Sequence, residues 1–359
     1  NEEHGHLLPG FGLVLIYLNL PGGSGEYGTP GEEDRRGPIS RAAVGVALRY
    51  AAGELQDDDG CFLGDRMVVE LAPRRIIAGY SNGGNLAWAT LADDDVDLPE
   101  VVGIATFETP TSGQFATVEP GTGGEPSPVY REQSCALDEE LGITCEYTYD
   151  GLTYDMDGAA ETSGVLYIDV DEDDSYTEND FALGQVWSPT DELWMHSSQA
   201  TWAAEAGSIE LPLRGDGPQA EAFWSTREAP RSARALAERW PELAVIAAGS
   251  EEDHILSGMS GHAHVTGLIS AAQAAGMAWS RVQPDACYAE LVANEELDFA
   301  DNPADLEVTV HDEQVSMEPD QDYSSEGSQY LTAAVLELLD RAWADDWSPD
   351  LDSTLVASP

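Results

Sequence analysis

Short apolar runs and helical patterns of apolar residues alternate along two parts of the chain, before residue 109 and after residue 220. An unbroken apolar run between turn formers is typical of a strand buried on both faces, and apolar residues at i, i+3 and i+4 are typical of a helix with one buried face. Strands that alternate with helices predict an α/β fold, with a mostly parallel sheet and helices on both faces. The expected strands are 11–18, 75–79, 101–107, 243–248 and 279–282, and the expected helices are 39–53, 82–91, 229–240, 262–275 and 328–344.

The pattern changes between residues 109 and 220. This segment is rich in Gly, Pro, Thr and Asp, and strands and helices do not clearly alternate in it. We therefore expect an inserted, irregular lid subdomain at 109–220 within a core formed by 1–108 and 221–345, followed by a polar tail at 346–359. Within the second part of the core, residues 285–326 are expected to form a long acidic loop.

Charge is the most unusual property of the composition. The 359 residues include 68 Asp and Glu against 15 Arg and no Lys, which gives a net charge of −53. No basic surface is expected that could bind nucleic acid or anionic lipid. The 42% of hydrophobic residues supply enough core for the chain to fold despite its charge. Repulsion among carboxylates nearly vanishes at molar salt, where the Debye length is about 3 Å. The composition therefore predicts a protein adapted to a hypersaline medium.

The compartment follows from weaker signals. We expect an extracellular or envelope-associated protein, with the cytoplasm of a salt-accumulating cell as the alternative. No apolar run approaches the ~20 residues that span a bilayer. Cys135 and Cys145 bracket a segment rich in turn formers, and a disulfide between them would indicate an oxidising compartment. Two free thiols are the alternative.

The segment Gly79-Tyr80-Ser81-Asn82-Gly83 lies between a predicted strand and a predicted helix. G-x-S-x-G in this context is typical of a nucleophile elbow, a tight turn with small residues two positions before and after the serine. Such a turn presents the serine Oγ above the sheet, and the N–H of the next residue, Asn82, points at a developing oxyanion. Ser81 is therefore the candidate nucleophile, and a purely structural turn is the alternative.

This strand–turn–helix unit resembles the α/β-hydrolase superfamily, and the resemblance covers most of the chain outside the insertion. It implies a second oxyanion donor in the turn after strand 11–18, where the backbone N–H groups of Gly23 and Ser24 are available, although the family's His is replaced by Leu20. It also implies an acid after strand 243–248. Asp253 is the favoured acid and Glu252 is its rival.

The general base is the residue that the resemblance does not place. The family's His follows the last strand, where this chain has Asp285 instead, which could serve as the orienting acid. A base must lie about 2.6–3.2 Å from the serine Oγ. His262 and His264 are favoured because they follow Asp253 closely. No other potential ligand stands near them at metal-binding spacing, so a metal site is not favoured. The remaining alternatives are His311, from chain order, and His254, from its adjacency to the acid.

A second constellation lies within the insertion. Acidic residues occupy positions 1, 3, 5 and 12 of a loop that begins after an apolar strand, and hydroxyls occupy positions 7 and 9. This is the spacing of an EF-hand-type loop, which supplies about seven oxygens to Ca²⁺. Asp174 stands where the template has Gly. The expected structural calcium ligands are Asp169, Asp171, Asp173, Ser175 and Asp180.

These features predict a serine hydrolase that cleaves small-molecule carboxylic esters through an acyl-enzyme at high salt, with a calcium-braced lid. One alternative is a serine peptidase of the same fold, because the Gly-Tyr-Ser-Asn-Gly-Gly elbow also resembles peptidases of this type. The other is a catalytically inactive hydrolase-fold protein with a binding or envelope role, because no His stands at the family's position.

Overall fold

The structure is a computed structural model of the chain. It describes residues 14–22, 29–31, 34, 36–67, 73–111, 121–122, 125–126, 136–140, 142–144, 152–155, 165–169, 172–173, 175, 177, 181–185, 187–190, 193–195, 225–249, 260–284, 308–310, 313–315 and 326–347.

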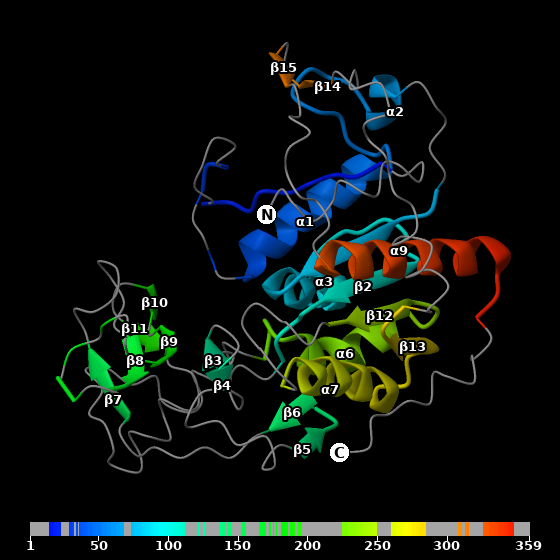
Figure 1. The fold of residues 1–359 in the computed structure, drawn as a ribbon. Helices are drawn as coiled ribbons and strands as arrows, with labels where there is room; N and C mark the ends of the chain where they lie inside the picture. The colour runs from blue at the N-terminus through cyan, green and yellow to red at the C-terminus, as the bar shows by residue number, and fades with distance from the viewer. Residues whose placement is uncertain are drawn as a thin grey trace.

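A four-stranded parallel sheet lies at the centre of the molecule (Figure 1). Every neighbouring pair of its strands is parallel, and Phe107 pairs with Tyr80 on one side and with Ala248 on the other. These strands confirm four of the five that the apolar runs predicted. In spatial order they are β1 (Ile76–Tyr80), β2 (Gly103–Phe107), β12 (Ala244–Ala248) and β13 (Trp279–Val282).

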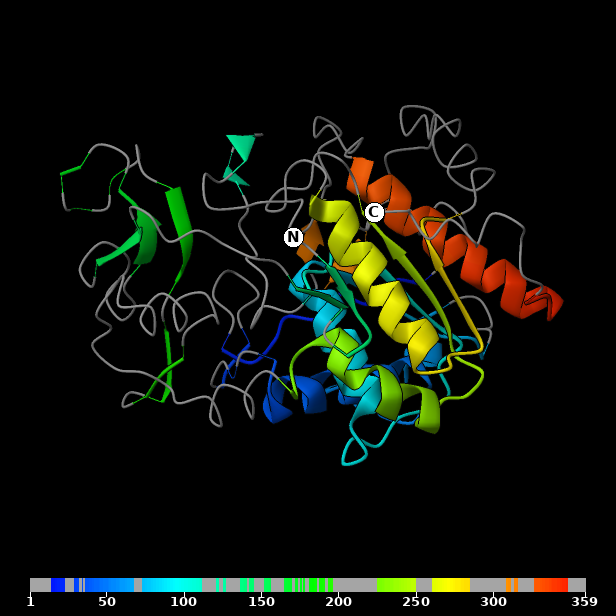
Figure 2. The same ribbon diagram turned by 90° about the horizontal axis from the view of Figure 1, so that it is seen from below.

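Helices cover both faces of this sheet, as the α/β pattern predicted (Figures 1 and 2). Alternate strand residues face opposite layers: Ile104 and Val245 pack against four helices on one side, whereas Ala105 and Ile246 pack against a single helix on the other. The four helices of the first layer are α1 (Pro38–Ala51), α3 (Asn82–Ala92), α6 (Ala229–Arg239) and α7 (Ser260–Ala274), and the helix of the second is α9 (Glu326–Ala344).

Helix α1 shows how local sequence sets the limits of an element. Its first turn has Pro at N1 and no acidic residue, and its free N–H groups are capped from upstream by Asp34. The Asp34 carboxylate accepts hydrogen bonds from the N–H groups of Ile39 at 2.6 Å and Ser40 at 3.2 Å. Just beyond the other end, Gly53 adopts φ 71°, a left-handed conformation that ends the helix and that glycine adopts most readily.

The predicted buried strand at 11–18 is wrong for the residues described, 14–18. They form no strand there, and the side chains of Val14, Ile16, Tyr17 and Leu18 are exposed. Within the described part of the chain, the central sheet ends at β1, and residues 14–18 do not add a strand to it. Apolar character alone does not make a strand, because the backbone N–H and C=O groups also need partners.

Outside residues 109–220, three elements of the described chain were not expected. A short helix, α2 (Leu63–Arg66), follows α1. The region predicted as a long acidic loop contains an antiparallel hairpin of β14 (Val308–Val310) and β15 (Glu313–Val315). No helix in the described ranges is long and apolar enough to cross a membrane.

The described strands between residues 109 and 220 pair only in antiparallel fashion. The β5–β6 hairpin lies against α7 (Figure 1), and a Cβ placed on Gly267 of that helix would lie 2.5 Å from the carbonyl oxygen of Gly142 in β6. Bare backbone on both partners therefore permits the close contact. The strands are β3 (Gly121–Thr122), β4 (Glu125–Pro126), β5 (Ala136–Asp138), β6 (Gly142–Thr144), β7 (Leu152–Asp155), β8 (Val165–Ile168), β9 (Phe181–Gln185), β10 (Trp187–Thr190) and β11 (Leu193–Met195).

Candidate functional site

The carboxyl edge of the central sheet carries unusual backbone strain. Three of its four strands are followed at once by a non-glycine residue with positive φ: Ser81 at 50°, Glu108 at 49° and Gln283 at 62°. Each such residue costs on the order of 1–3 kcal/mol, and such residues gather at functional sites. Open parallel sheets also bind their ligands at this edge. Two independent lines of reasoning therefore indicate the same part of the molecule.

Ser81 occupies the turn between β1 and α3. Its N–H donates to the carbonyl of Phe107 at 2.8 Å, and its carbonyl accepts the N–H of Gly84 at 3.0 Å. It stands at the N-cap of α3 with φ 50° and ψ −125°, and among the described residues its side chain makes no capping hydrogen bond. An ordinary N-cap serine is extended and bonds the N–H of N2 or N3. The side chain is half-buried, and the next residue, Asn82, is exposed.

Two glycines make this turn possible, but they are not the pair expected from the motif. A Cβ on Gly79 would lie 2.5 Å from the backbone nitrogen of Gly84, and a Cβ on Gly84 would lie 1.9 Å from Oγ1 of Thr109. At Gly83, two positions after the serine, a Cβ would meet nothing within 4 Å in the described part of the chain. The sterically required glycines are therefore Gly79 and Gly84, because the first turn of α3 packs against both β1 and the loop after β2.

The predicted oxyanion donors lie in two places. Asn82 is the first residue of α3, and the first N–H groups of a helix have no acceptor within the helix itself. Gly23 and Ser24 lie outside the described residues. Of the residues that flank them, the N–H of Gly22 donates to the carbonyl of Thr29 at 3.0 Å.

Most of the predicted acids and bases lie outside the described residues. His262 belongs to α7, but its side chain lies outside the described part. The residues whose backbone also lies outside it are Asp253, Glu252, His254, Asp285 and His311.

His264 is the one candidate base whose surroundings are described. It is 2% exposed, and its Nδ1 accepts a hydrogen bond from the N–H of Thr111 at 2.9 Å. Burial lowers the pKa of the imidazole to about 4, so the ring is neutral at pH 7. Because Nδ1 accepts, the proton resides on Nε2, which then donates rather than accepts. These contacts tie the loop after β2 to α7 and give His264 the surroundings of a scaffold residue.

Glu108 is a candidate that the sequence analysis missed. It follows β2 immediately, is 4% exposed, and its N–H donates to the carbonyl of Ala248 at 2.8 Å. Because Tyr80 pairs with Phe107, Ser81 and Glu108 lie at the same level on adjacent strands. In a chain with 68 acidic residues, a single Glu does not stand out as a site residue in the sequence. Its positive φ is visible only in the structure.

Asn85 holds the surroundings of the turn in place. It is 1% exposed in α3, and its Nδ2 donates to the carbonyl of Pro110 at 2.9 Å while its Oδ1 accepts the N–H of Ala229 at 2.9 Å. One amide thus joins the helix after Ser81, the loop after Glu108 and the start of α6. Satisfied buried polar groups of this kind fix a single arrangement.

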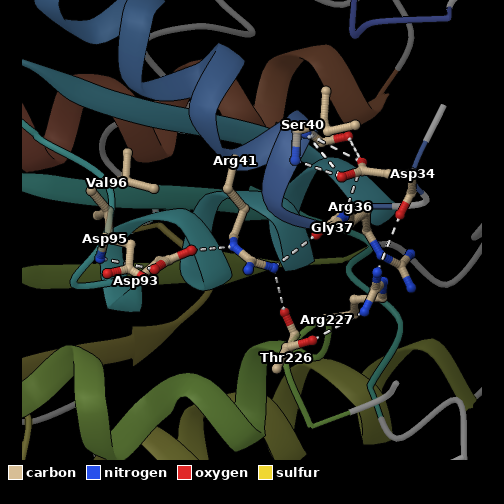
Figure 3. A network of polar contacts seen from close by, with 12 residues as sticks. Asp34, Arg36, Gly37, Ser40, Arg41, Asp93, Asp95, Val96, Thr226 and Arg227 are labelled. Atoms are coloured by element: carbon tan, nitrogen blue, oxygen red, sulfur yellow. Dashed lines mark hydrogen bonds and ion pairs between the residues drawn. The ribbon is translucent and has the colours of Figure 1, made fainter. Parts of the chain in front are cut away.

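Arginines from distant parts of the sequence meet around the loop before α1 (Figure 3). Arg36 donates through Nη1 to the side-chain oxygen of Asn82. Arg41 pairs with Asp93 at 2.6 Å and donates to the carbonyl of Thr226 at 3.1 Å. Arg227 donates to Oγ1 of Thr226 at 3.0 Å, so both guanidinium groups reach the same residue.

The predicted calcium loop is described in part. Oδ1 of Asp169 accepts the N–H of Asp173 at 3.2 Å, and Oδ1 of Asp173 accepts the N–H of Ser175 at 2.8 Å. Asp171 and Asp180 lie outside the described residues. No three His, Cys, Asp or Glu side chains are grouped to hold a metal within the described ranges.

Comparison with known proteins identifies no relative: no family model, no curated protein and no solved structure matches the chain.

Proposed function

We propose that the chain is a serine hydrolase of the α/β-hydrolase type that cleaves carboxylic esters at high salt. The conformation of Ser81 carries this proposal. The serine follows a parallel strand of the central sheet and precedes a helix that its side chain does not cap, and it has a left-handed φ in a turn where Gly79 and Gly84 leave no space for a Cβ. Strain at a residue whose hydroxyl is not used for capping has no structural benefit, but it presents a nucleophile.

The proposed reaction gives each candidate residue a role. Ser81 Oγ attacks the ester carbonyl carbon while a histidine accepts the hydroxyl proton, and the same histidine then protonates the leaving alcohol. Water hydrolyses the acyl-enzyme by the reverse sequence. The N–H of Asn82 and a donor from Gly23 or Ser24 stabilise the oxyanion. His262 is the first candidate base, with His254 and His311 as alternatives.

Two residues are candidates for the acid that orients the histidine, and different observations favour each. The resemblance to hydrolases favours Asp253, whereas burial beside the strand end of Ser81 favours Glu108. Either carboxylate would hold the imidazole in one tautomer and stabilise the imidazolium that forms.

Labelling with a fluorophosphonate probe in 3 M KCl tests the proposal. We expect the wild type to be labelled, Ser81→Ala to lose the label, and Ser280→Ala, a serine on β13, to retain it. Absence of label in folded wild type would contradict the hydrolase and favour a binding or envelope role. Label with turnover of peptides but not of 4-nitrophenyl esters would favour the peptidase.

We also propose that the loop from Asp169 to Asp180 binds calcium. Ile168 pairs with Phe181, so the loop starts and ends at one point of the β8–β9 hairpin, as a chain that encircles an ion must. We expect CaCl₂ to raise Tm and a chelator to lower it, and Asp169→Asn with Asp173→Asn to remove both effects. A Tm that does not respond to chelator would contradict calcium binding.

A further inference from the structure

Arginine is scarce in this chain, yet three arginines gather around the loop before α1, and one of them reaches the residue after the candidate nucleophile. Only 15 arginines face 68 acidic residues over the whole sequence. Arg36, Arg41 and Arg227, which we call the arginine cluster, converge on the loop before α1 (Figure 3). Nη2 of Arg227 donates to the backbone carbonyl of Asp34 at 3.3 Å and lies 2.6 Å from where a Cβ on Gly37 would stand.

Two guanidinium groups of the cluster, those of Arg41 and Arg227, lie close enough to influence each other's charge. Asp93 pairs with Arg41, and the Asp34 carboxylate accepts N–H groups from the start of α1. The pKa of Arg227 is lowered, first by burial and then by the neighbouring charge of Arg41, while Asp34 opposes these two effects. A guanidinium that is half-buried beside another guanidinium is stabilised by an additional anion.

Arg36 connects the arginine cluster to the turn that contains the candidate nucleophile. Its guanidinium bonds the side chain of Asn82, the exposed residue that follows Ser81. Its own backbone adopts φ 67°, a conformation that a non-glycine residue rarely takes. The contact places a cation next to the candidate nucleophile, and both Arg36 and Ser81 have a positive φ.

We propose that the arginine cluster binds a carboxylate of the substrate through Arg36, so that the preferred substrates are esters bearing a free carboxylate. This inference rests on the proposed esterase function. The planar fork of a guanidinium matches a carboxylate with two parallel hydrogen bonds, a geometry that the spherical chloride of a saline medium cannot reproduce. Molar salt also screens the long-range repulsion between the anionic substrate and a chain of net charge −53, while the contact with arginine persists.

A matched pair of esters tests the inference in 3 M KCl. Mono-4-nitrophenyl adipate and 4-nitrophenyl hexanoate have acyl chains of equal length and the same leaving group, and they differ in the terminal carboxylate. We expect wild type to prefer the adipate ester in kcat/KM. Arg36→Gln should lower kcat/KM for the adipate ester roughly tenfold, the effect of one charge-assisted hydrogen bond, and change that of the hexanoate ester less than about twofold.

The control is Arg49→Gln, which replaces a half-exposed arginine at the far end of the helix that carries Arg41, and it should leave both esters unaffected. An equal loss on both esters in Arg36→Gln would overturn the inference, because Arg36 would then act through Asn82 on the turn itself. A wild type without preference for the anionic ester would overturn it too.

Calorimetry separates this inference from the proposed function. Adipate should bind the Ser81→Ala protein and fail to bind the Ser81→Ala/Arg36→Gln protein, whether or not the wild type turns over esters. If Ser81 is not labelled but adipate binds through Arg36, the hydrolase fails and the carboxylate site stands. If Ser81 is labelled but adipate does not bind, the carboxylate site fails and the hydrolase stands.

Discussion

The turn at Ser81 and the contact between His264 and Thr111 lie at opposite ends of one loop, residues 108–111, and they are built in opposite ways. At the turn, a half-exposed hydroxyl makes no capping bond within the described residues, and the backbone is strained. At the other end, a fully buried imidazole has its Nδ1 satisfied by a backbone N–H. Both side chains are polar, but only the Ser81 hydroxyl is left without a capping hydrogen bond in the described residues. Backbone strain beside a polar side chain that makes no capping bond is typical of functional sites, whereas burial with satisfied partners is typical of the scaffold.

The largest expected effect concerns Glu108, the first residue of this loop. It belongs either to the proposed catalytic site at Ser81 or to the scaffold. If Glu108 orients the base, Glu108→Gln should lower kcat by about 10³–10⁴-fold with little change in Tm, because a missing orienting acid removes transition-state stabilisation. Burial on the strand next to Ser81 leads us to expect this result. Asp253→Asn is the matched variant. A large kcat loss there, with Glu108→Gln fully active, would assign Glu108 to the scaffold.

The next effect tests how tightly the turn is packed. Gly79→Ala and Gly84→Ala should each destabilise the protein by about 1–3 kcal/mol or more, because their Cβ atoms would meet backbone or the Thr109 hydroxyl. Gly83→Ala should be neutral or stabilising by up to about 1 kcal/mol, because it places alanine in a helix with open space around it. Thermal unfolding in 3 M KCl measures all three. Equal destabilisation by the three substitutions would show that the turn is not packed as described.

His264 should act through its acceptor atom rather than through catalysis. His264→Leu leaves the N–H of Thr111 buried without an acceptor, which costs about 1–3 kcal/mol. His264→Asn keeps an acceptor oxygen near the position of Nδ1 and should restore most of that stability. If both variants kept their stability but lost ester turnover, His264 would be the general base instead.

The same residue predicts a pH dependence with a definite sign. The pKa of His264 falls from 6.5 to about 4 on folding, so the unfolded chain binds the extra proton between these values. The stability that the neutral ring provides is complete above about pH 6.5 and is lost as the pH falls towards 4, by about 1.4 kcal/mol per pH unit. The difference in unfolding free energy between wild type and His264→Asn isolates this effect from that of the carboxylates. A difference independent of pH over this range would contradict the buried neutral ring.

The smallest expected effect concerns the strain itself. Ser81→Gly should be more stable than Ser81→Ala by about 1 kcal/mol, because glycine adopts φ 50° without a steric penalty. Both proteins lack the hydroxyl, so their difference in Tm reports the backbone alone. Equal stability would mean that the turn at Ser81 is relaxed.

The sequence predicted what depends on neighbouring residues and missed what depends on distant ones. The four strands of the sheet and the turn at Ser81 each follow from a run of adjacent residues, and all of them are present. Thr111 and His264 are 153 residues apart, so no local pattern indicates their contact. The importance of Gly84 over Gly83 depends on Thr109, which comes from another strand's loop. The strand prediction for residues 14–18 was wrong for the same reason, because pairing in a sheet depends on residues elsewhere in the chain.

The hydrogen bonds of the arginine cluster to backbone carbonyls bear on how the protein responds to dilution of salt. Arg41 donates to the carbonyls of Arg36 and Thr226, and Arg227 donates to that of Asp34, so residues 34–41 are fastened to residues 226–227 by cations bonded to uncharged oxygens. A bond to a neutral acceptor depends less on ionic strength than an exposed ion pair does. When salt is withdrawn, the acidic surface repels itself more strongly, and the contact between residues 34–41 and 226–227 should therefore be among the last to open. In hydrogen exchange, the backbone amides of these residues should stay protected after the amides of the acidic surface have lost their protection.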